Sequence, residues 1–139
     1  SRISGPLLDR IDLHVDVPRV PPEVIAGTER AEPSLSVARR VAEARSRQLQ
    51  RQGRSNARIE GVDVIASVRA DAAALALLDR AMRCLSLSAR AFHRVLRVAR
   101  TIADLAGCDA VSIAHVAEAV ALRQLDRRTS GPALDLISA

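Results

Sequence analysis

The sequence contains no lysine, and all 21 of its basic residues are arginine. A phosphate-binding loop of the GxxxxGK[ST] type needs a lysine that reaches the β- and γ-phosphates of a nucleotide. The chain therefore cannot hold nucleotide phosphates with such a loop of its own. The formal charge is nonetheless +5, and the planar, permanently charged arginine side chain is well suited to phosphate oxygens.

Aromatic residues are almost absent, since Phe92 is the only one in the chain. A core built from Ala, Val, Leu and Ile suits closely packed helices better than a β-sandwich. The two cysteines, Cys84 and Cys108, lie outside any CxxC pattern, and we expect each to be a small buried apolar residue. No apolar run approaches the about 20 residues that span a bilayer, and no leader sequence is recognised, so we expect a cytoplasmic protein without membrane contact.

The histidines offer no metal or nucleophile pattern. His14, His93 and His115 share no HExxH or comparable spacing, and no Ser-His-Asp or Cys-His arrangement is suggested. The sequence therefore predicts no metal site.

The segment Ser1 to Val17 predicts a strand whose sheet lies elsewhere. Apolar and polar side chains alternate over residues 11–17, which is typical of a strand with one buried face. The rest of the sequence reads as helix, and a lone strand cannot satisfy its backbone hydrogen bonds. We therefore expect residues 1–17 to be the remnant of a larger α/β domain.

The remaining sequence predicts a mainly α fold, a bundle of four to five helices over residues 34–128. Residues 18–33 carry four prolines and read as a linker that resists helix and sheet, and residues 129–139 read as a flexible tail. The expected helices cover residues 34–52, 62–67, 71–85, 88–106 and 112–126. Asp71, Ser88 and Ser112 are the expected caps, and Gly53 and Gly107 the expected stops.

The inward faces of these helices follow from the spacing of apolar residues. In the first long helix they are Ala38, Val41, Ala42 and Leu49. In the helix that follows Ser88, which has the clearest pattern, they are Ala89, Phe92, Val95, Leu96, Ala99, Ile102, Ala103 and Ala106.

Two single arginines stand at positions where a guanidinium could meet a ligand. Arg10 precedes the predicted strand, and the alternative there is a local salt bridge to Asp9 or Asp12. Arg90 lies in the first turn of a helix, where the dipole disfavours a cation and attracts an anion. An anionic partner near Arg90 or simple solvation would explain its position equally well.

Other arginines form stripes along predicted helices. A solvated face explains Arg94, Arg97 and Arg100 adequately. A second stripe could track a nucleic-acid backbone, although a solvated face is again the alternative. No aromatic residue interleaves it, so the contact would be electrostatic and independent of base sequence. The residues of this stripe are Arg40, Arg47, Arg51, Arg54 and Arg58.

Three motifs in this order resemble the C-terminal part of the ComM/YifB family of magnesium-chelatase-like AAA+ ATPases. They are RISGPLLDRIDLHV at residues 2–15, LSARAFHRVLRVARTIADL at 87–105 and HVAEAVALRQLDR at 115–127. The resemblance covers residues 2–127. It implies that residues 1–17 are the last strand of the AAA+ core and that residues 34–128 are its helical lid.

The resemblance also implies roles for the two single arginines. Arg10 matches the arginine finger that reaches ATP in an adjacent subunit, and Arg90 matches the sensor-2 arginine of the lid. ATP and Mg²⁺ would be held by the AAA+ core in a hexameric ring, because the Walker A, Walker B and first-sensor motifs do not occur here. No cofactor is expected in this stretch alone.

The implied activity is ATP-driven DNA branch migration in recombination during natural transformation. Two alternatives stay open at this point. One is a magnesium-chelatase-type ATPase subunit that remodels a protein partner. The other is a free-standing helical module that binds DNA or protein and has no ATPase parent.

Overall fold

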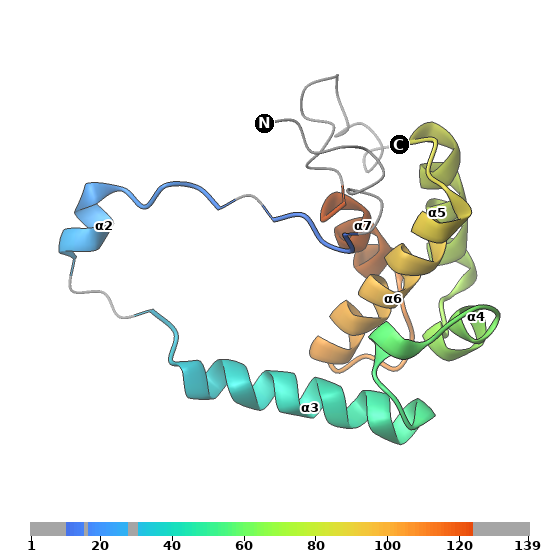
Figure 1. Cartoon of the computed structure of the whole chain (residues 1–139), viewed down its shortest axis with the longest axis horizontal. Coiled ribbons are helices and arrows are strands. Elements are labelled where there is room, and N and C mark those ends of the chain that lie inside the picture. The colour runs from blue at the N-terminus through green and yellow to red at the C-terminus, as the bar shows by residue number, and fades with distance from the viewer. Residues whose placement is uncertain (1–10, 16, 28–30, 124–139) are drawn as a thin grey trace.

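A computed structural model describes residues 11–15, 17–27 and 31–123, and these ranges are mainly α-helical (Figure 1). They contain six α-helices and no strand. The helices are α2 (Pro22–Ala26), α3 (Ser34–Gln52), α4 (Asp63–Val68), α5 (Ala72–Cys84), α6 (Ala89–Leu105) and α7 (Ile113–Ala121), and a 3₁₀ helix, η1 (Asn56–Arg58), follows α3. The predicted mainly α fold is confirmed.

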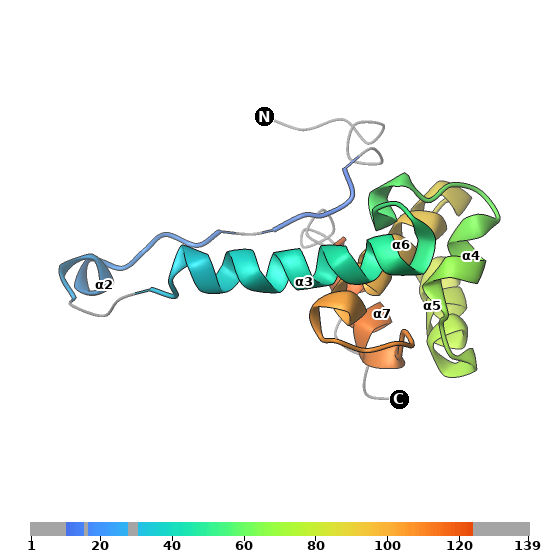
Figure 2. The ribbon, with the colours of Figure 1, turned by 90° about the horizontal axis from the view of Figure 1, so that it is seen from below.

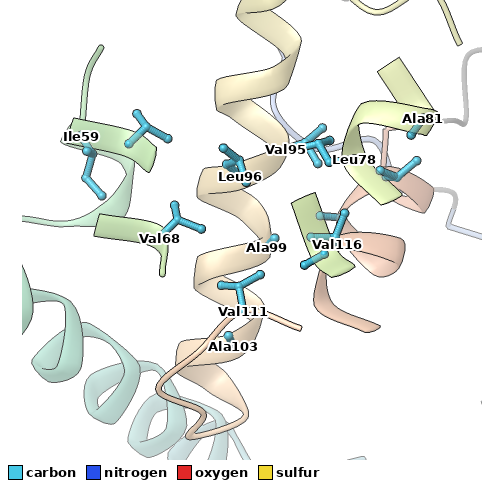
Figure 3. Close-up of a cluster of buried hydrophobic side chains, with 14 of the residues drawn as sticks. Ile59, Val68, Leu78, Ala81, Val95, Leu96, Ala99, Ala103, Val111 and Val116 are labelled. Carbon is cyan, nitrogen blue, oxygen red and sulfur yellow. The ribbon is translucent and has the colours of Figure 1, made fainter. Parts of the chain in front are cut away.

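Helix α6 is the centre of the bundle. It packs against α3, α4, η1 and α7, and α7 also packs against α5. Its inner face carries Val95, Leu96 and Ala99, all buried as the apolar spacing predicts. Figure 3 shows this face between Val68 on one side and Leu78 on the other. The small alanines of α6 let the neighbouring elements approach closely, as expected of a core without aromatic rings.

The predicted caps form at α5 and α6. The Asp71 carboxylate accepts a hydrogen bond from the Ala74 backbone N at 2.6 Å, and the Ser88 hydroxyl accepts one from the Ala91 N at 3.2 Å. Each satisfies one of the backbone N–H groups left unpaired at a helix start. Gly53 closes α3 with a φ of 70°, a left-handed conformation that glycine adopts without strain.

Helix α7 begins as predicted but ends earlier. In place of a glutamate, His115 at the third position accepts a hydrogen bond on Nδ1 from the Ser112 backbone N at 3.1 Å. This is the reciprocal half of a capping box. The helix ends at Ala121 rather than near residue 126, and residue 126 lies outside the described residues.

The inward face predicted for α3 is wrong, because all four of its predicted residues are exposed. Ala44 and Gln48 are buried, whereas Val41 and Leu49 are 53% and 46% exposed. Figures 1 and 2 show the reason for the first three predicted residues: only the C-terminal half of α3 lies against the bundle, and its N-terminal half extends away from the other helices. In the C-terminal half the predicted face is itself the wrong one, because Ala44 and Gln48 are buried there and Leu49 is not.

The strand predicted for residues 11–17 is not formed in its described part, 11–15 and 17. Instead, the His14 backbone N donates to the Leu122 carbonyl at 2.8 Å, which ties this segment to the end of α7. A strand requires a neighbouring strand, and none is present in the described ranges.

The linker predicted for residues 18–33 contains one helical element. Pro22 stands at the first position of α2, where its missing N–H has no hydrogen bond to lose. The expectation that the prolines exclude helix throughout this segment is therefore wrong for five residues.

Two further expectations concern the burial of the cysteines and the absence of membrane-spanning helices. Cys84 and Cys108 are free thiols and both are exposed, so their predicted burial is wrong. Among the described residues, none of the helices combines the length and the apolar character that a bilayer crossing demands.

Candidate functional site

Helix α6 carries four arginines, Arg90, Arg94, Arg97 and Arg100, at intervals of three or four residues. This spacing places them near one another along one side of the helix. Their surroundings change along α6, from solvent at the first turn to complete burial near the last.

Arg100 is completely buried, with 0% of the residue exposed. Its Nη1 donates to the backbone carbonyls of Val68 at 3.2 Å and Asp109 at 2.7 Å, and its Nη2 donates to that of Cys108. The guanidinium thus joins the end of α4 to the loop that follows α6. Arg100 also forms an ion pair with Asp104, at 3.0 Å between Nη2 and Oδ1.

Asp104 lies between two guanidiniums in what we call the buried ion-pair cluster, Arg51, Arg100 and Asp104. Both oxygens of Asp104 accept from Arg51, and its Oδ2 also accepts from Asn56 Nδ2 at 2.9 Å. The Asn56 backbone N donates to Gln48 Oε1 at 3.0 Å. The cluster and its neighbours therefore fix the C-terminal end of α3 and η1 against α6.

Burial and charge act in opposite directions on this cluster. Burial by itself would raise the pKa of Asp104, but hydrogen bonds from Arg51 and Asn56 and the charge of Arg100 outweigh it and hold the pKa below its ordinary value. Burial lowers the pKa of Arg100, and the charge of Asp104 opposes this change. Each charge in the cluster depends on its partner to remain ionised out of water.

Arg94 and Arg97 are also engaged by the protein. Arg97 Nη1 donates to the Ile59 carbonyl at 3.1 Å. Arg94 forms an ion pair with Asp12 at 3.0 Å, and only 15% of its side chain is exposed. The solvated face predicted for Arg94, Arg97 and Arg100 is therefore wrong, since all three hold α6 to other segments.

Arg90 is the exception. It is exposed in the first turn of α6, two residues after the Ser88 cap, and it makes no hydrogen bond or ion pair with any residue that the structure describes. A guanidinium at a helix start, where the backbone N–H groups also point outward, favours an anionic ligand. Arg10, the other predicted nucleotide contact, lies outside the described residues.

The predicted nucleic-acid stripe is divided between internal and surface roles. Arg40 pairs with Glu32, whose pKa is lowered by the hydrogen bond from Arg40, and Arg54 pairs with Asp63 at 3.0 Å. Both pairs lie at the surface. Arg51 is different, because its guanidinium is held by Asp104 and is not presented to solvent.

Arg47 and Arg58 complete the stripe. Both are exposed, and neither forms an ion pair with a described residue. These two arginines are the members of the stripe whose charge is available to an external phosphate.

Sequence reasoning missed the buried ion-pair cluster, although one signal for it was present. Arg100 lies four residues after Leu96 and three before Ala103, within the apolar face of α6. An acid follows at the i+4 position, Asp104, which can meet the guanidinium on the same face. A charged pair at core positions, flanked by alanines that leave room for it, indicates a buried ion pair.

Comparison with known proteins places most of the chain in one family. The family model for the C-terminal region of magnesium chelatase, subunit ChlI, matches residues 31–123. The chain is 38% identical over 128 residues to the competence protein ComM of Haemophilus influenzae. It is 40% identical over 128 residues to the uncharacterized protein YifB of Salmonella typhimurium, and 37% identical over 132 residues to the uncharacterized protein Mb2921c of Mycobacterium bovis.

These similarities cover nearly the whole chain but a small part of each relative. The matches span 91% of the chain with the ComM and YifB proteins and 92% with the mycobacterial protein. They span 25%, 25% and 26% of the relatives, so the chain corresponds to about a quarter of the length of the curated relatives it matches.

Proposed function

The chain belongs to the magnesium chelatase subunit ChlI C-terminal family, and from this premise we propose that it forms the helical lid of a larger AAA+ ATPase. In this proposal residues 34–128 are the lid, and residues 1–17 belong to the edge of the ATPase core. ATP and Mg²⁺ are held by other parts of the protein, because the chain has no lysine and hence no phosphate-binding loop.

One observation carries the proposal. Arg90 is exposed at the start of α6, whereas the next three arginines of the same helix are bound by the protein. A cation at a helix start is mildly unfavourable, and an anionic ligand such as a nucleotide phosphate would offset that cost. Arg90 would then have the sensor-2 role and would follow the state of the nucleotide.

Arg94, Arg97 and Arg100 support this role by holding α6. The helix is tied to segment 11–15 through Arg94, to the residue after η1 through Arg97 and to the end of α4 through Arg100. A phosphate contact in a catalytic site must be held in place to stabilise developing charge. Arg10 would supply a second guanidinium to ATP bound by the neighbouring subunit of a hexameric ring.

The test is ATP hydrolysis by the full-length protein with Arg90→Ala. We expect steady-state turnover to fall by about 100-fold, the typical cost of removing a preorganised contact to transition-state charge. Arg83→Ala is the matched control, because Arg83 is an exposed arginine whose ion pair with Asp79 stays within α5. Equal turnover by both variants would remove the sensor-2 assignment.

For the work done by the motor, we propose DNA branch migration during natural transformation. The relative from Haemophilus influenzae is named a competence protein. The chain also carries a net charge of +5, with Arg47 and Arg58 exposed and unpaired among the described residues. Such a surface would contact the DNA backbone without reading its sequence.

The salt dependence of binding to forked DNA tests this activity. In the full-length protein, Arg58→Ala should weaken binding and reduce the slope of log affinity against log salt by about 1. The family description favours a second candidate, a chelatase-type subunit that remodels a protein partner. No binding of forked DNA at moderate salt would support this second candidate over the first.

A further inference from the structure

A short segment near the start of the chain is attached to α6 and α7 by three contacts. Asp12 Oδ1 forms an ion pair with Arg94 Nη1 at 3.0 Å. The Ile11 carbonyl accepts from Arg123 Nη1 at 3.2 Å, and the His14 backbone N donates to the Leu122 carbonyl at 2.8 Å. Of these contacts, one joins the segment to α6 and two join it to the end of α7.

In the sequence, each partner of the ion pair is close to one of the two arginines that are proposed to contact nucleotide. Asp12 is two residues after Arg10 in the sequence, and Arg94 is one helical turn after Arg90. The ion pair therefore links the segment that follows the proposed arginine finger to the helix that begins with the proposed sensor-2 residue.

Arg94 is the buried partner of this ion pair, whereas the Asp12 side chain is 55% exposed. The Arg94 side chain is 15% exposed, and its Nε and Nη1 atoms are buried without a hydrogen-bond acceptor among the described residues. Among the described residues, the Asp12 carboxylate is therefore the group that offsets the lost hydration of the mostly buried Arg94 guanidinium. Loss of that charge would leave the guanidinium partly desolvated and unpaired, a state that favours movement of one segment away from the other.

We propose that Asp12 and Arg94 are positioning residues that fix α6, and Arg90 with it, relative to the segment that follows Arg10. This inference rests on the proposed function, because it assigns the pair a role in setting where the lid stands against the ATPase core. Arg94 acts through Arg90 and does not itself contact the nucleotide. By contrast, Arg83 and Asp79 form an exposed ion pair within α5 that joins no second segment.

The experiment is a charge-exchange cycle in the full-length protein. Steady-state ATP hydrolysis is measured for Asp12→Arg, for Arg94→Asp and for the double variant that carries both changes. Each single variant places like charges together, so we expect kcat to fall by roughly tenfold, within the range that small displacements of a catalytic group produce. KM for ATP should change by less than about twofold, because the phosphates remain bound by the core.

The double variant restores opposite charges in exchanged positions, and we expect it to recover most of the lost kcat. Asp12→Asn supplies a milder change that leaves the fold in place, and it should lower kcat in the same direction. Asp79→Asn on α5 is the matched control, since it breaks an exposed ion pair that stays within one helix, and its kcat should equal that of the wild type. Recovery on charge exchange would show that the attraction between the two opposite charges, rather than either side chain alone, carries the effect.

Two results would overturn the inference. One is a wild-type kcat in Asp12→Asn and in both single reversals. The other is a double variant as impaired as the single ones. Both results are compared with the ATP hydrolysis of Arg90→Ala. If Arg90→Ala loses activity and the ion-pair variants keep it, the proposed function stands and the positioning role fails.

A second measurement requires no turnover. Hydrogen–deuterium exchange of the peptide containing residues 11–15 should be faster in Asp12→Arg and should return toward the wild-type rate in the double variant. Unchanged exchange in the single variant would contradict the attachment itself, whatever the protein does with ATP.

Discussion

Arg51 donates from both terminal nitrogens to both oxygens of Asp104, at 2.7 Å and 2.9 Å, and so joins the end of α3 to α6. This paired geometry is the strongest arrangement available to an arginine and a carboxylate. Asp104 is 2% exposed and also meets the buried Arg100. A single carboxylate thus balances two guanidiniums at the place where the projecting helix meets the bundle.

Removal of that carboxylate should destabilise the domain. Asp104→Asn keeps the size of the side chain but leaves Arg51 and Arg100 without a counter-charge in a buried site. We expect a loss of about 3 kcal/mol in the free energy of unfolding, in line with the removal of one partner from a buried ion pair. Urea unfolding followed by circular dichroism measures the loss. The control Asp79→Asn breaks an exposed pair within α5 and should cost no more than about 0.5 kcal/mol.

The same carboxylate should make stability depend on acid pH. Its pKa is lower in the folded protein than its ordinary value of 3.8, so folding favours the ionised form. The resulting stabilisation is complete above the unfolded pKa and is lost as the pH falls through the lower, folded pKa. The difference in unfolding free energy between wild type and Asp104→Asn should therefore be largest at neutral pH and shrink below about pH 4. A difference that stays constant from pH 7 to pH 3 would argue against this assignment.

The Ser88 cap should contribute measurably to α6. Its hydroxyl accepts from the Ala91 backbone N, so Ser88→Ala leaves a helix N–H without this partner. The expected loss is about 1 kcal/mol in the free energy of unfolding. Ser46→Ala is the matched control, because the Ser46 side chain is exposed within α3, where alanine is the better helix former. A greater loss from the control than from Ser88→Ala would show that capping is not what the serine supplies.

Arg10 should matter for turnover rather than for nucleotide binding. In the full-length protein, Arg10→Ala should reduce ATP hydrolysis by about 10³- to 10⁵-fold, the range found for arginine fingers supplied in trans. Nucleotide affinity should remain within a few-fold of wild type, because the phosphates are held by the neighbouring core. Equilibrium binding of a fluorescent ATP analogue and steady-state hydrolysis separate the two effects. Normal hydrolysis by this variant would remove the assignment.

Local sequence signals predicted the helices of the bundle well. The caps at Asp71 and Ser88 and the stop at Gly53 depend on backbone groups within a few residues, so the sequence alone is sufficient to place them. The apolar face of α6 was likewise predicted from Phe92 to Ala103, where the helix is covered, whereas Ala89 and Ala106 at its two ends are exposed.

Features that depend on distant partners were not predicted. The exposure of the N-terminal half of α3 follows from how far the bundle reaches along it, and the absence of a strand at residues 11–15 follows from the absence of a pairing strand in the described ranges. Arg100 was assigned to the surface because an arginine is rarely buried completely. Its burial requires Asp104 together with three backbone carbonyls that come from two other segments.

The candidate site was predicted in part. Sequence reasoning singled out Arg90, and the structure places it exposed at the start of α6. It did not find the contact between Arg94 and Asp12, because no periodicity relates two residues so far apart in the chain.

The structure of the full-length protein with Mg²⁺ and a non-hydrolysable ATP analogue tests the central claim most directly. The measured quantity is the distance from the Arg90 guanidinium to the nearest phosphate oxygen. The account predicts a direct contact, within about 3 Å, as is usual for a charge-assisted hydrogen bond. Arg90 pointing into solvent while a different cation occupies that position would contradict it.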